Sequence, residues 1–169
     1  MRLIAVDPGL RACGLAYFAD GALCHAALVH SPEKTARGGQ CWIAMGWAVA
    51  EHLQQRGIVW NCGVVEQPQQ YEARFMKGDR ADITELTGVA SAVALILSVK
   101  APEVQTPLPA AWKGQVKKDV HNRRALSRLL PHELQVIDWP KKSGGAVNPA
   151  LAHNVIDAVA LGLWRIGRL

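Results

Sequence analysis

Three acidic residues stand where apolar segments end, or within one. Asp7 and Glu66 each follow an apolar run, and Asp157 lies within the apolar residues 155–161. A buried carboxylate without a partner is destabilising by several kcal/mol, so such acids are usually paired, hydrogen-bonded or metal-bound. Each acid alone has a structural interpretation, as a turn residue, an exposed strand end or a satisfied polar group in a helix. The three together favour a shared metal cluster.

The chemistry of these acids points to a hard divalent cation. Carboxylate oxygens suit Mg²⁺ or Mn²⁺ better than zinc. Two such ions held about 3.5–4 Å apart can activate water and stabilise the leaving oxygen of a phosphodiester. His153 and Asn154 lie four and three residues before Asp157, so one helix face can carry all three. His153 and Asn154 are therefore further candidate ligands, although a histidine on a helix is as easily structural.

Strands are the first secondary-structure elements that the sequence predicts for positioning these residues. Three apolar runs, residues 3–6, 14–18 and 23–29, predict an antiparallel meander, because Asp20-Gly21 is a hairpin turn signal. The apolar residues 58–65 predict a strand covered on both faces. Residues 104–106 predict a further short strand, and residues 136–137 either one more or an irregular link.

Helices are expected between and after these strands. One follows Gly38-Gly39 and ends at Arg56-Gly57, and a second begins at Asp82 as N-cap, with Glu85 completing a capping box, and ends near residue 99. A basic helix is expected over residues 119–130, and a last helix from Asn148-Pro149 to about residue 166. The order predicts a single α/β domain, a mixed sheet with helices on its faces. The six tryptophans are expected in the core or in a dimer interface.

Charge is unevenly distributed along the 169 residues, whose net charge is +5. From residue 109 onward there are ten Lys or Arg against four Asp or Glu, whereas the first 108 residues carry nine against ten. A basic C-terminal third suits a polyanion partner, although a modest excess also simply aids solubility. The N-terminus lacks a signal-peptide pattern, and no uncharged apolar stretch reaches membrane-spanning length, which predicts a cytoplasmic protein without a membrane partner.

Four blocks of sequence resemble the RuvC-type Holliday-junction resolvases, in order over nearly the whole chain. The first is AVDPGLRACGLAYF, the second is GVVEQPQQYEARFMKGDRADITELTGVASAVALIL, and the last is HNVIDAVALGLW. Between them, PAAWKGQVKK followed by HNRRALSRLL is similar to phage-type members. An Asp-Pro-Gly turn alone is a weak signal, whereas four blocks in order are a strong one.

This resemblance implies an RNase H-like fold with a mixed five-stranded sheet, a homodimer, and paired symmetric nicks across a four-way DNA junction. It places Asp7, Glu66 and Asp157 in a site for two Mg²⁺ or Mn²⁺ ions, with no small-molecule cofactor. Asn154 is a departure, since many members carry a fourth acid there. Its oxygen can ligate a metal without adding charge, and His153 is an alternative replacement.

DNA contacts are expected from basic residues and from an aromatic loop. The basic residues would grip phosphates rather than recognise sequence, and Lys117 or Lys118 would stabilise charge at the scissile phosphate. The loop after Glu66 would wedge an aromatic side chain into the junction, with Phe75 favoured over Tyr71. Phe75 could equally pack on the next helix, and the basic residues could be a solvated surface. The candidates are Tyr71, Arg74, Phe75, Lys77, Lys113, Lys117, Lys118, Arg123, Arg124, Lys141 and Lys142, the last two on a loop expected to be flexible.

Three alternatives remain beside a junction-cleaving enzyme. Asn154 favours a non-catalytic junction-binding protein that has lost a metal ligand. An RNase H-like nuclease acting on RNA or on a hybrid duplex would use the same acids. A phosphotransferase of the actin and sugar-kinase type also begins with an Asp-x-Gly turn, but it needs two such domains, and 169 residues leave no room for them.

Overall fold

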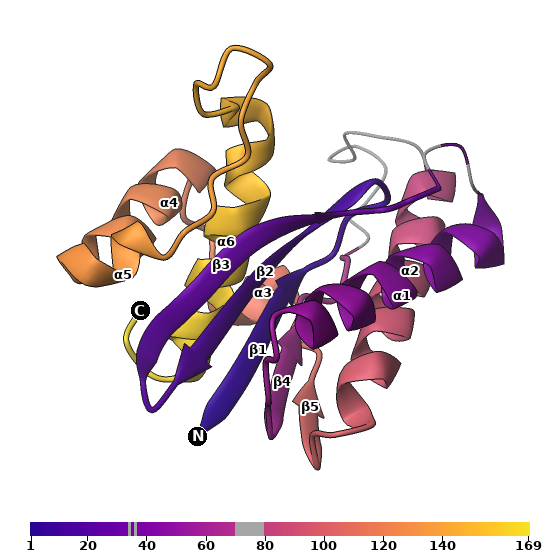
Figure 1. Cartoon of the computed structure of the whole chain (residues 1–169), viewed down its shortest axis with the longest axis horizontal. Helices are drawn as coiled ribbons and strands as arrows, with labels where there is room; N and C mark the ends of the chain where they lie inside the picture. Colours follow the sequence, from indigo (N-terminus) through magenta and orange to yellow (C-terminus); the bar gives the residue numbers. More distant parts are fainter. Residues whose placement is uncertain (34, 36, 70–79) are drawn as a thin grey trace.

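A mixed five-stranded sheet forms the centre of the structure, a computed structural model that describes residues 1–33, 35, 37–69 and 80–169 (Figure 1). The strand order is β3-β2-β1-β4-β5. β1, β2 and β3 pair antiparallel, and β4 and β5 continue the sheet in parallel. The expected combination of a meander with parallel strands is confirmed. The strands are β1 (Arg2–Asp7), β2 (Ala12–Ala19), β3 (Ala22–His30), β4 (Cys62–Val65) and β5 (Glu103–Gln105).

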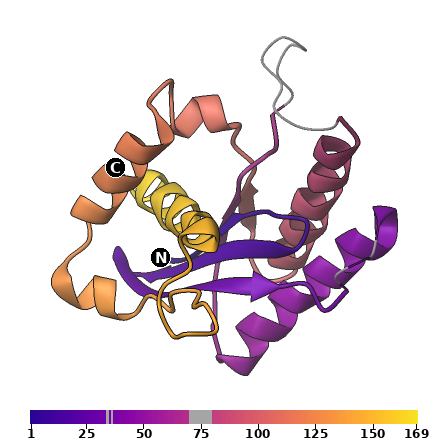
Figure 2. The same ribbon diagram turned by 90° about the horizontal axis from the view of Figure 1, so that it is seen from above.

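Helices cover both faces of this sheet. α1 and α2 pack on one face, whereas α6 lies on the other with α4 beside it (Figure 2). The helices are α1 (Gly38–Gln55), α2 (Arg80–Ser98), α3 (Pro109–Trp112), α4 (Lys118–Ser127), α5 (Pro131–Gln135) and α6 (Pro149–Arg165). We call the two sides of the molecule the α6 face and the α1–α2 face.

β1 is buried from both sides, which explains its uninterrupted apolar run. Leu3 and Ala5 belong to the core beneath α6, whereas Ile4 and Val6 belong to the core beneath α1 and α2. Successive side chains of a strand point to opposite faces of the sheet. The residue that continues the Leu3–Ala5 series is Asp7.

Two turn and cap predictions are confirmed. Asp20 and Gly21 both have positive φ, 50° and 84°, the backbone that the tight β2–β3 hairpin needs. The side chain of Asn148 accepts a hydrogen bond from the Ala150 backbone nitrogen at 3.2 Å, with Pro149 in the first turn of α6. The start of the last helix is therefore fixed by local chemistry.

Two expected boundaries were wrong. The strand expected over residues 58–65 is limited to Cys62–Val65, because the chain before it serves packing instead: Trp60 is buried, and its Nε1 donates to Leu97 O at 3.0 Å. α2 begins at Arg80, so Asp82 lies within its first turn and is not the N-cap. The Asp82 carboxylate instead pairs with Arg37 at 3.4 Å.

The basic helix expected over residues 119–130 is confirmed as α4, but it ends three residues early. α4 ends at Ser127 and α5 begins at Pro131, a residue that is favoured only in the first turn of a helix. The short helices α3 and α5 were not anticipated. Ile137 makes a single parallel bridge with Ala26, so residues 136–137 are an irregular link.

α2 is strongly apolar. By length and composition alone, its residues Ala81–Ser98 could cross a membrane, and only 22% of that window is buried. Val89, Val93 and Leu97 pack into the core beneath α1 and α2, which accounts for one side of the helix. The remaining apolar side faces outward.

Candidate active site

Strand register brings Asp7 and Glu66 to the α6 face. Ala5 and Val64 both belong to the core beneath α6, and Asp7 and Glu66 each lie two residues further along the same strands. The Glu66 backbone nitrogen donates to Val6 O at 3.0 Å, which continues the parallel pairing of β1 and β4 past the end of β4. The two acids therefore lie side by side where the neighbouring strands β1 and β4 end.

Asp157 reaches the same place from α6, and it is only 3% exposed. The helix can lie this close because β2 has a glycine beneath it. A Cβ on Gly14 would stand 1.8 Å from the backbone oxygen of Asn154, so any other residue would push α6 away from the sheet. Gly14 thus sets the depth at which Asp157 is held.

Two lysines neutralise the acids directly. Lys113 Nζ lies 2.9 Å from Glu66 Oε2 and 3.9 Å from Asp157 Oδ2. Lys118 Nζ lies 3.0 Å from the same Asp157 oxygen. Because one ammonium group reaches carboxylates from β4 and from α6, Glu66 and Asp157 belong to one site.

Asp7 belongs to the same electrostatic cluster. Burial raises the pKa of Asp7 well above its ordinary value, and repulsion from Asp157 and Glu66 raises it further. Burial likewise raises the pKa of Glu66, although Lys113 opposes that rise. Burial alone would lower the pKa of Lys113, but the attraction of the three acids outweighs it and raises the pKa. The cluster therefore favours cations.

The donor chemistry of this cluster fits Mg²⁺ or Mn²⁺, whereas its side-chain positions are those of a site neutralised by lysine. Three carboxylates supply hard oxygen ligands. Glu66 Oε2 is buried and, within the described part of the chain, accepts no hydrogen bond of good geometry despite its ion pair. Among the described residues no three His, Cys, Asp or Glu side chains are grouped to hold a metal. A metal ion would therefore require Lys113 to withdraw from Glu66.

Comparison with solved structures identifies the fold. No family model matches the chain, and no curated protein matches it. The structure of Thermus thermophilus RuvC superposes with a TM-score of 0.56, at 20% identity, over 99% of this chain and 98% of that one. The T. thermophilus RuvC complex with a Holliday junction gives 0.56 at 17% identity, over 97% and 92%. The yeast mitochondrial Holliday junction resolvase Ydc2 gives 0.51 at 11% identity, over 99% and 81%. The chain has the RuvC-type fold. The expected RNase H-like architecture is thereby confirmed.

On this RuvC-type fold, His153 lies within electrostatic reach of the cluster. Burial lowers the pKa of His153, the charge of Lys118 lowers it further, and Asp157 opposes both. Asn154 lies one turn before Asp157 and contributes its backbone to the close approach at Gly14. The roles of both residues as metal ligands stay predictions.

The predicted DNA-binding lysines and arginines of this RuvC-type fold divide into two groups. Lys113 is largely buried among the acids, and Lys118 contacts Asp157 while keeping 57% of its side chain exposed. The others are exposed, with Arg123 in an ion pair to Asp119 at 3.6 Å. These exposed residues are Lys117, Arg123, Arg124, Lys141 and Lys142. Tyr71, Arg74, Phe75 and Lys77 lie outside the described residues.

The loop that carries Lys141 and Lys142 forms a hydrogen-bonded hairpin in this structure, and its expected flexibility stays a prediction. Lys142 N donates to Ala146 O at 2.8 Å, and Gly145 N returns to Lys142 O at 2.9 Å. Lys141 also forms an antiparallel bridge with Val147. Figure 1 shows this segment beyond the N-terminal end of α6. Lys141 and Lys142 are both exposed.

Two residues near the acids were not predicted as site residues. Trp112 is buried, with Lys113 Nζ lying 4.5 Å from the centre of its ring. With its amide nitrogen turned towards the acid, Asn122 donates to Asp157 Oδ1 at 3.3 Å. Asn122 follows Lys118 by four residues on α4, and this helical spacing was the available signal. Nothing in the sequence pattern alone marked Trp112.

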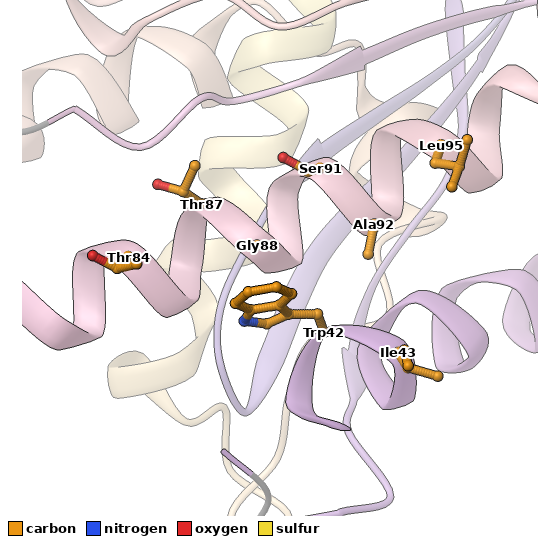
Figure 3. Close-up of a pocket in the computed structure, with 8 residues that line it drawn as sticks. All are labelled: Trp42, Ile43, Thr84, Thr87, Gly88, Ser91, Ala92 and Leu95. Carbon is orange, nitrogen blue, oxygen red and sulfur yellow. The ribbon is translucent and has the colours of Figure 1, made fainter. Parts of the chain in front are cut away.

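The α1–α2 face of the RuvC-type fold has a different chemistry. Figure 3 shows a groove between the two helices, in which the Trp42 indole lies against Gly88. A Cβ on Gly88 would stand 2.1 Å from that ring, so glycine is required there. Leu95 lines this groove and is 68% exposed, and Trp47 and Val99, which line a second pocket on the same face, are 66% and 76% exposed. Trp47 is therefore not a core residue, which leaves the interface interpretation open.

Proposed function

We propose that this chain is a divalent-metal-dependent endonuclease that resolves four-way DNA junctions. The observation that carries the proposal is the meeting of Asp7, Glu66 and Asp157 beneath two lysines on the α6 face. Structures of similar fold support it, since one is described as RuvC bound to a Holliday junction and another as a Holliday junction resolvase. Paired symmetric nicks and a role in recombination and repair are part of the proposal.

Asp7, Glu66 and Asp157 would hold Mg²⁺ or Mn²⁺, with Asn154 and His153 as further candidate ligands. Two such ions would supply an activated water and stabilisation of the leaving oxygen. Their arrival would release Lys113 and Lys118 from the carboxylates. Lys118, already more than half exposed, would then turn its ammonium group to a phosphate oxygen and stabilise developing negative charge.

DNA would approach the α6 face along the exposed basic residues. Arg123 and Arg124 on α4, with Lys141 and Lys142 on the hairpin, would contact phosphates and fix the position of the junction. Such contacts release counterions, so binding should weaken steeply as salt increases. The net charge of +5 is consistent with this partner.

A homodimer would place two such sites on one junction. The exposed Trp47, Leu95 and Val99 form an apolar surface on the face opposite the acids, and monomers rarely expose large contiguous apolar patches. A second copy docking there would bury this surface and leave both α6 faces open to DNA. Paired nicking needs both active sites to be accessible to the strands of one junction.

The direct test is cleavage of a labelled four-way junction, with and without Mg²⁺ or Mn²⁺. Wild type should release symmetric nicked duplexes only with metal, and Asp7→Asn should be inactive because one metal-binding charge is gone. Plain duplex and an RNA–DNA hybrid serve as competing substrates. Preferential cleavage of the hybrid would replace the junction proposal with an RNase H-like activity.

A non-catalytic junction-binding protein is the second candidate. Asn154 brings no charge where many RuvC-type members have an acid, and Lys113 and Lys118 already neutralise the remaining acids. This alternative predicts tight junction binding by wild type without cleavage under either metal. It also predicts that Asp7→Asn binds the junction as tightly as wild type and, like wild type, does not cleave it.

A further inference from the structure

The segment that links β5 to α4 carries a buried polar group, the Trp112 indole N–H, that the proposed chemistry has not used. Trp112 is 7% exposed, and its Nε1 has no hydrogen-bond partner among the described residues. A buried N–H without a partner costs about 1–3 kcal/mol, so each such group requires a physical explanation. The explanation lies in its neighbours.

Glu66 supplies the complementary unsatisfied group. Its Oε2 is buried and, in the described part of the chain, also lacks a hydrogen bond of good geometry. The two side chains contact the same ammonium group, since Lys113 Nζ lies 2.9 Å from Glu66 Oε2 and 4.5 Å from the centre of the Trp112 ring. An orphan donor and an orphan acceptor therefore belong to adjacent side chains.

Trp112 is held in place on its other sides. His121, buried on α4, meets the indole edge-on with ring centres 5.1 Å apart. Lys113 Nζ lies over the ring, a cation–π contact. Lys118 and Asn122 of α4 both reach Asp157, so the region from α3 to α4 covers both acids.

We propose that Trp112 is a positioning residue that orients Glu66 through its indole N–H once Lys113 withdraws from that carboxylate. Lys113 Nζ now pairs with Glu66 Oε2 at 2.9 Å. After the lysine leaves, a hydrogen bond from the Trp112 N–H would keep the carboxylate oriented towards the other two acids. Groups that hydrogen-bond to ligating carboxylates set their orientation, and losing one typically costs about 10–100-fold in metal affinity or activity. The expected effect on metal affinity and cleavage rests on the proposed function, whereas the hydrogen bond between Trp112 and Glu66 does not.

The contact is tested first, without metal or DNA, in a Lys113→Met background, because this substitution frees the Glu66 carboxylate from the lysine. A ¹H–¹⁵N spectrum resolves the indole N–H signals of the six tryptophans, and Trp112→Phe assigns the Trp112 signal by its disappearance. Glu66→Gln should shift that signal and leave the Trp60 signal unmoved. An unmoved Trp112 signal would overturn the proposal.

The consequence is then measured with a matched pair of variants. Trp112→Phe keeps a ring against His121 and removes the N–H, whereas Trp60→Phe removes an equally buried N–H, the donor to Leu97 O, on the opposite side of the sheet. Trp112→Phe should lower Mn²⁺ affinity, measured by calorimetry, by about tenfold or more. It should also lower kcat for cleavage by about 10–100-fold, with KM for junction DNA unchanged.

The two variants also separate a positioning role from a packing role. Trp60→Phe should lose stability but keep wild-type Mn²⁺ affinity and kcat. If both variants behave alike, Trp112 is a packing residue and the proposal fails. If wild type cleaves nothing, the nuclease proposal fails, while the indole shift still decides whether Trp112 orients Glu66.

Discussion

The two faces of this sheet are built from the same kinds of element but carry opposite chemistry. On the α6 face, charged groups are wholly or partly buried: Asp157 is 3% exposed, and the Lys113 side chain that pairs with it is 23% exposed. On the α1–α2 face, apolar groups are exposed, with Trp47 and Leu95 each about two-thirds accessible. Each face breaks the usual distribution of polar and apolar residues, and in opposite directions.

The buried charged groups of one face and the exposed apolar groups of the other each indicate a binding site. Buried carboxylates are tolerated where a cation compensates them, first lysine and then a metal ion in the proposed function. Exposed apolar side chains are tolerated where another surface covers them. The α6 face is thus suited to DNA chemistry, and the α1–α2 face is suited to association.

The largest expected effect concerns the acids of the α6 face. Glu66→Gln and Asp157→Asn should each lower the nicking rate by about 10³-fold or more, since a single preorganised electrostatic group already contributes about 10²–10³-fold. Junction binding should be unchanged or tighter, because a negative charge facing phosphate is removed. Nicking is measured on a labelled junction, and binding by gel shift without metal.

Asp119→Asn is the control for those variants, since it removes an exposed acid from α4 without touching the cluster. It should keep the wild-type nicking rate. A joint loss of binding and cutting in Glu66→Gln or Asp157→Asn would contradict their assignment to the metal site.

The strands and their order were predictable because the relevant signals are local. The Asp20-Gly21 turn and the Asn148-Pro149 cap both appear in the structure as expected. In the structure, the alternation of β1 puts Asp7 in series with Leu3 and Ala5. Boundaries at residue 58 and at Asp82 failed, since distant partners, Leu97 and Arg37, decided them.

The site was predictable in its acids but not in its cations. Apolar context marked Asp7, Glu66 and Asp157, because a carboxylate in such a segment needs compensation. Lys113 was expected on phosphates, yet its ammonium group lies on Glu66 and Asp157, a contact that depends on how α3 folds back over the sheet. Trp112 depends on the same tertiary placement, which no spacing rule encodes.

A second prediction concerns the ion pair that holds α5 against the C-terminal residues on the α6 face. Glu133 is 0% exposed and forms a two-pronged ion pair with Arg168, at 2.7 and 2.8 Å, tying α5 to the C-terminal residues. The Arg168 hydrogen bonds lower the pKa of Glu133 to about 2 from its ordinary 4.5. A depressed carboxylate pKa stabilises the fold above pH 4.5, and this contribution is lost as pH falls towards 2.

Arg168→Gln should therefore lower the free energy of unfolding at pH 7 by about 3–5 kcal/mol, since it leaves a buried charge unpaired. Urea unfolding at a series of pH values measures both the loss and its pH dependence between 4.5 and 2. Arg123→Gln breaks an exposed pair to Asp119 and should cost only about 0.3–0.5 kcal/mol. Equal losses in the two variants would show that the buried pair has no special role.

The smallest expected effect, and the one that tests the comparison most directly, uses one substitution on each face. Leu95→Glu places a charge on the exposed surface of α2, and Leu134→Glu places the same charge on α5, where Leu134 is 39% exposed. Burying that charge twice in a symmetric interface should weaken a dimer by about 100-fold, because single interface hot spots contribute about 2 kcal/mol or more. Sedimentation equilibrium measures the dissociation constant.

Leu134→Glu should leave dimerisation unchanged, since its face is left open to DNA. A monomeric Leu95→Glu should still nick a junction, because its acids are intact, but its two cuts should become independent rather than paired. If wild type is monomeric and binds phosphatidylcholine vesicles through α2, the apolar face serves a membrane and the dimer proposal is wrong. If Leu134→Glu dissociates the dimer instead, the association surface lies on the α6 side, and the contrast between the two faces would have to be reversed.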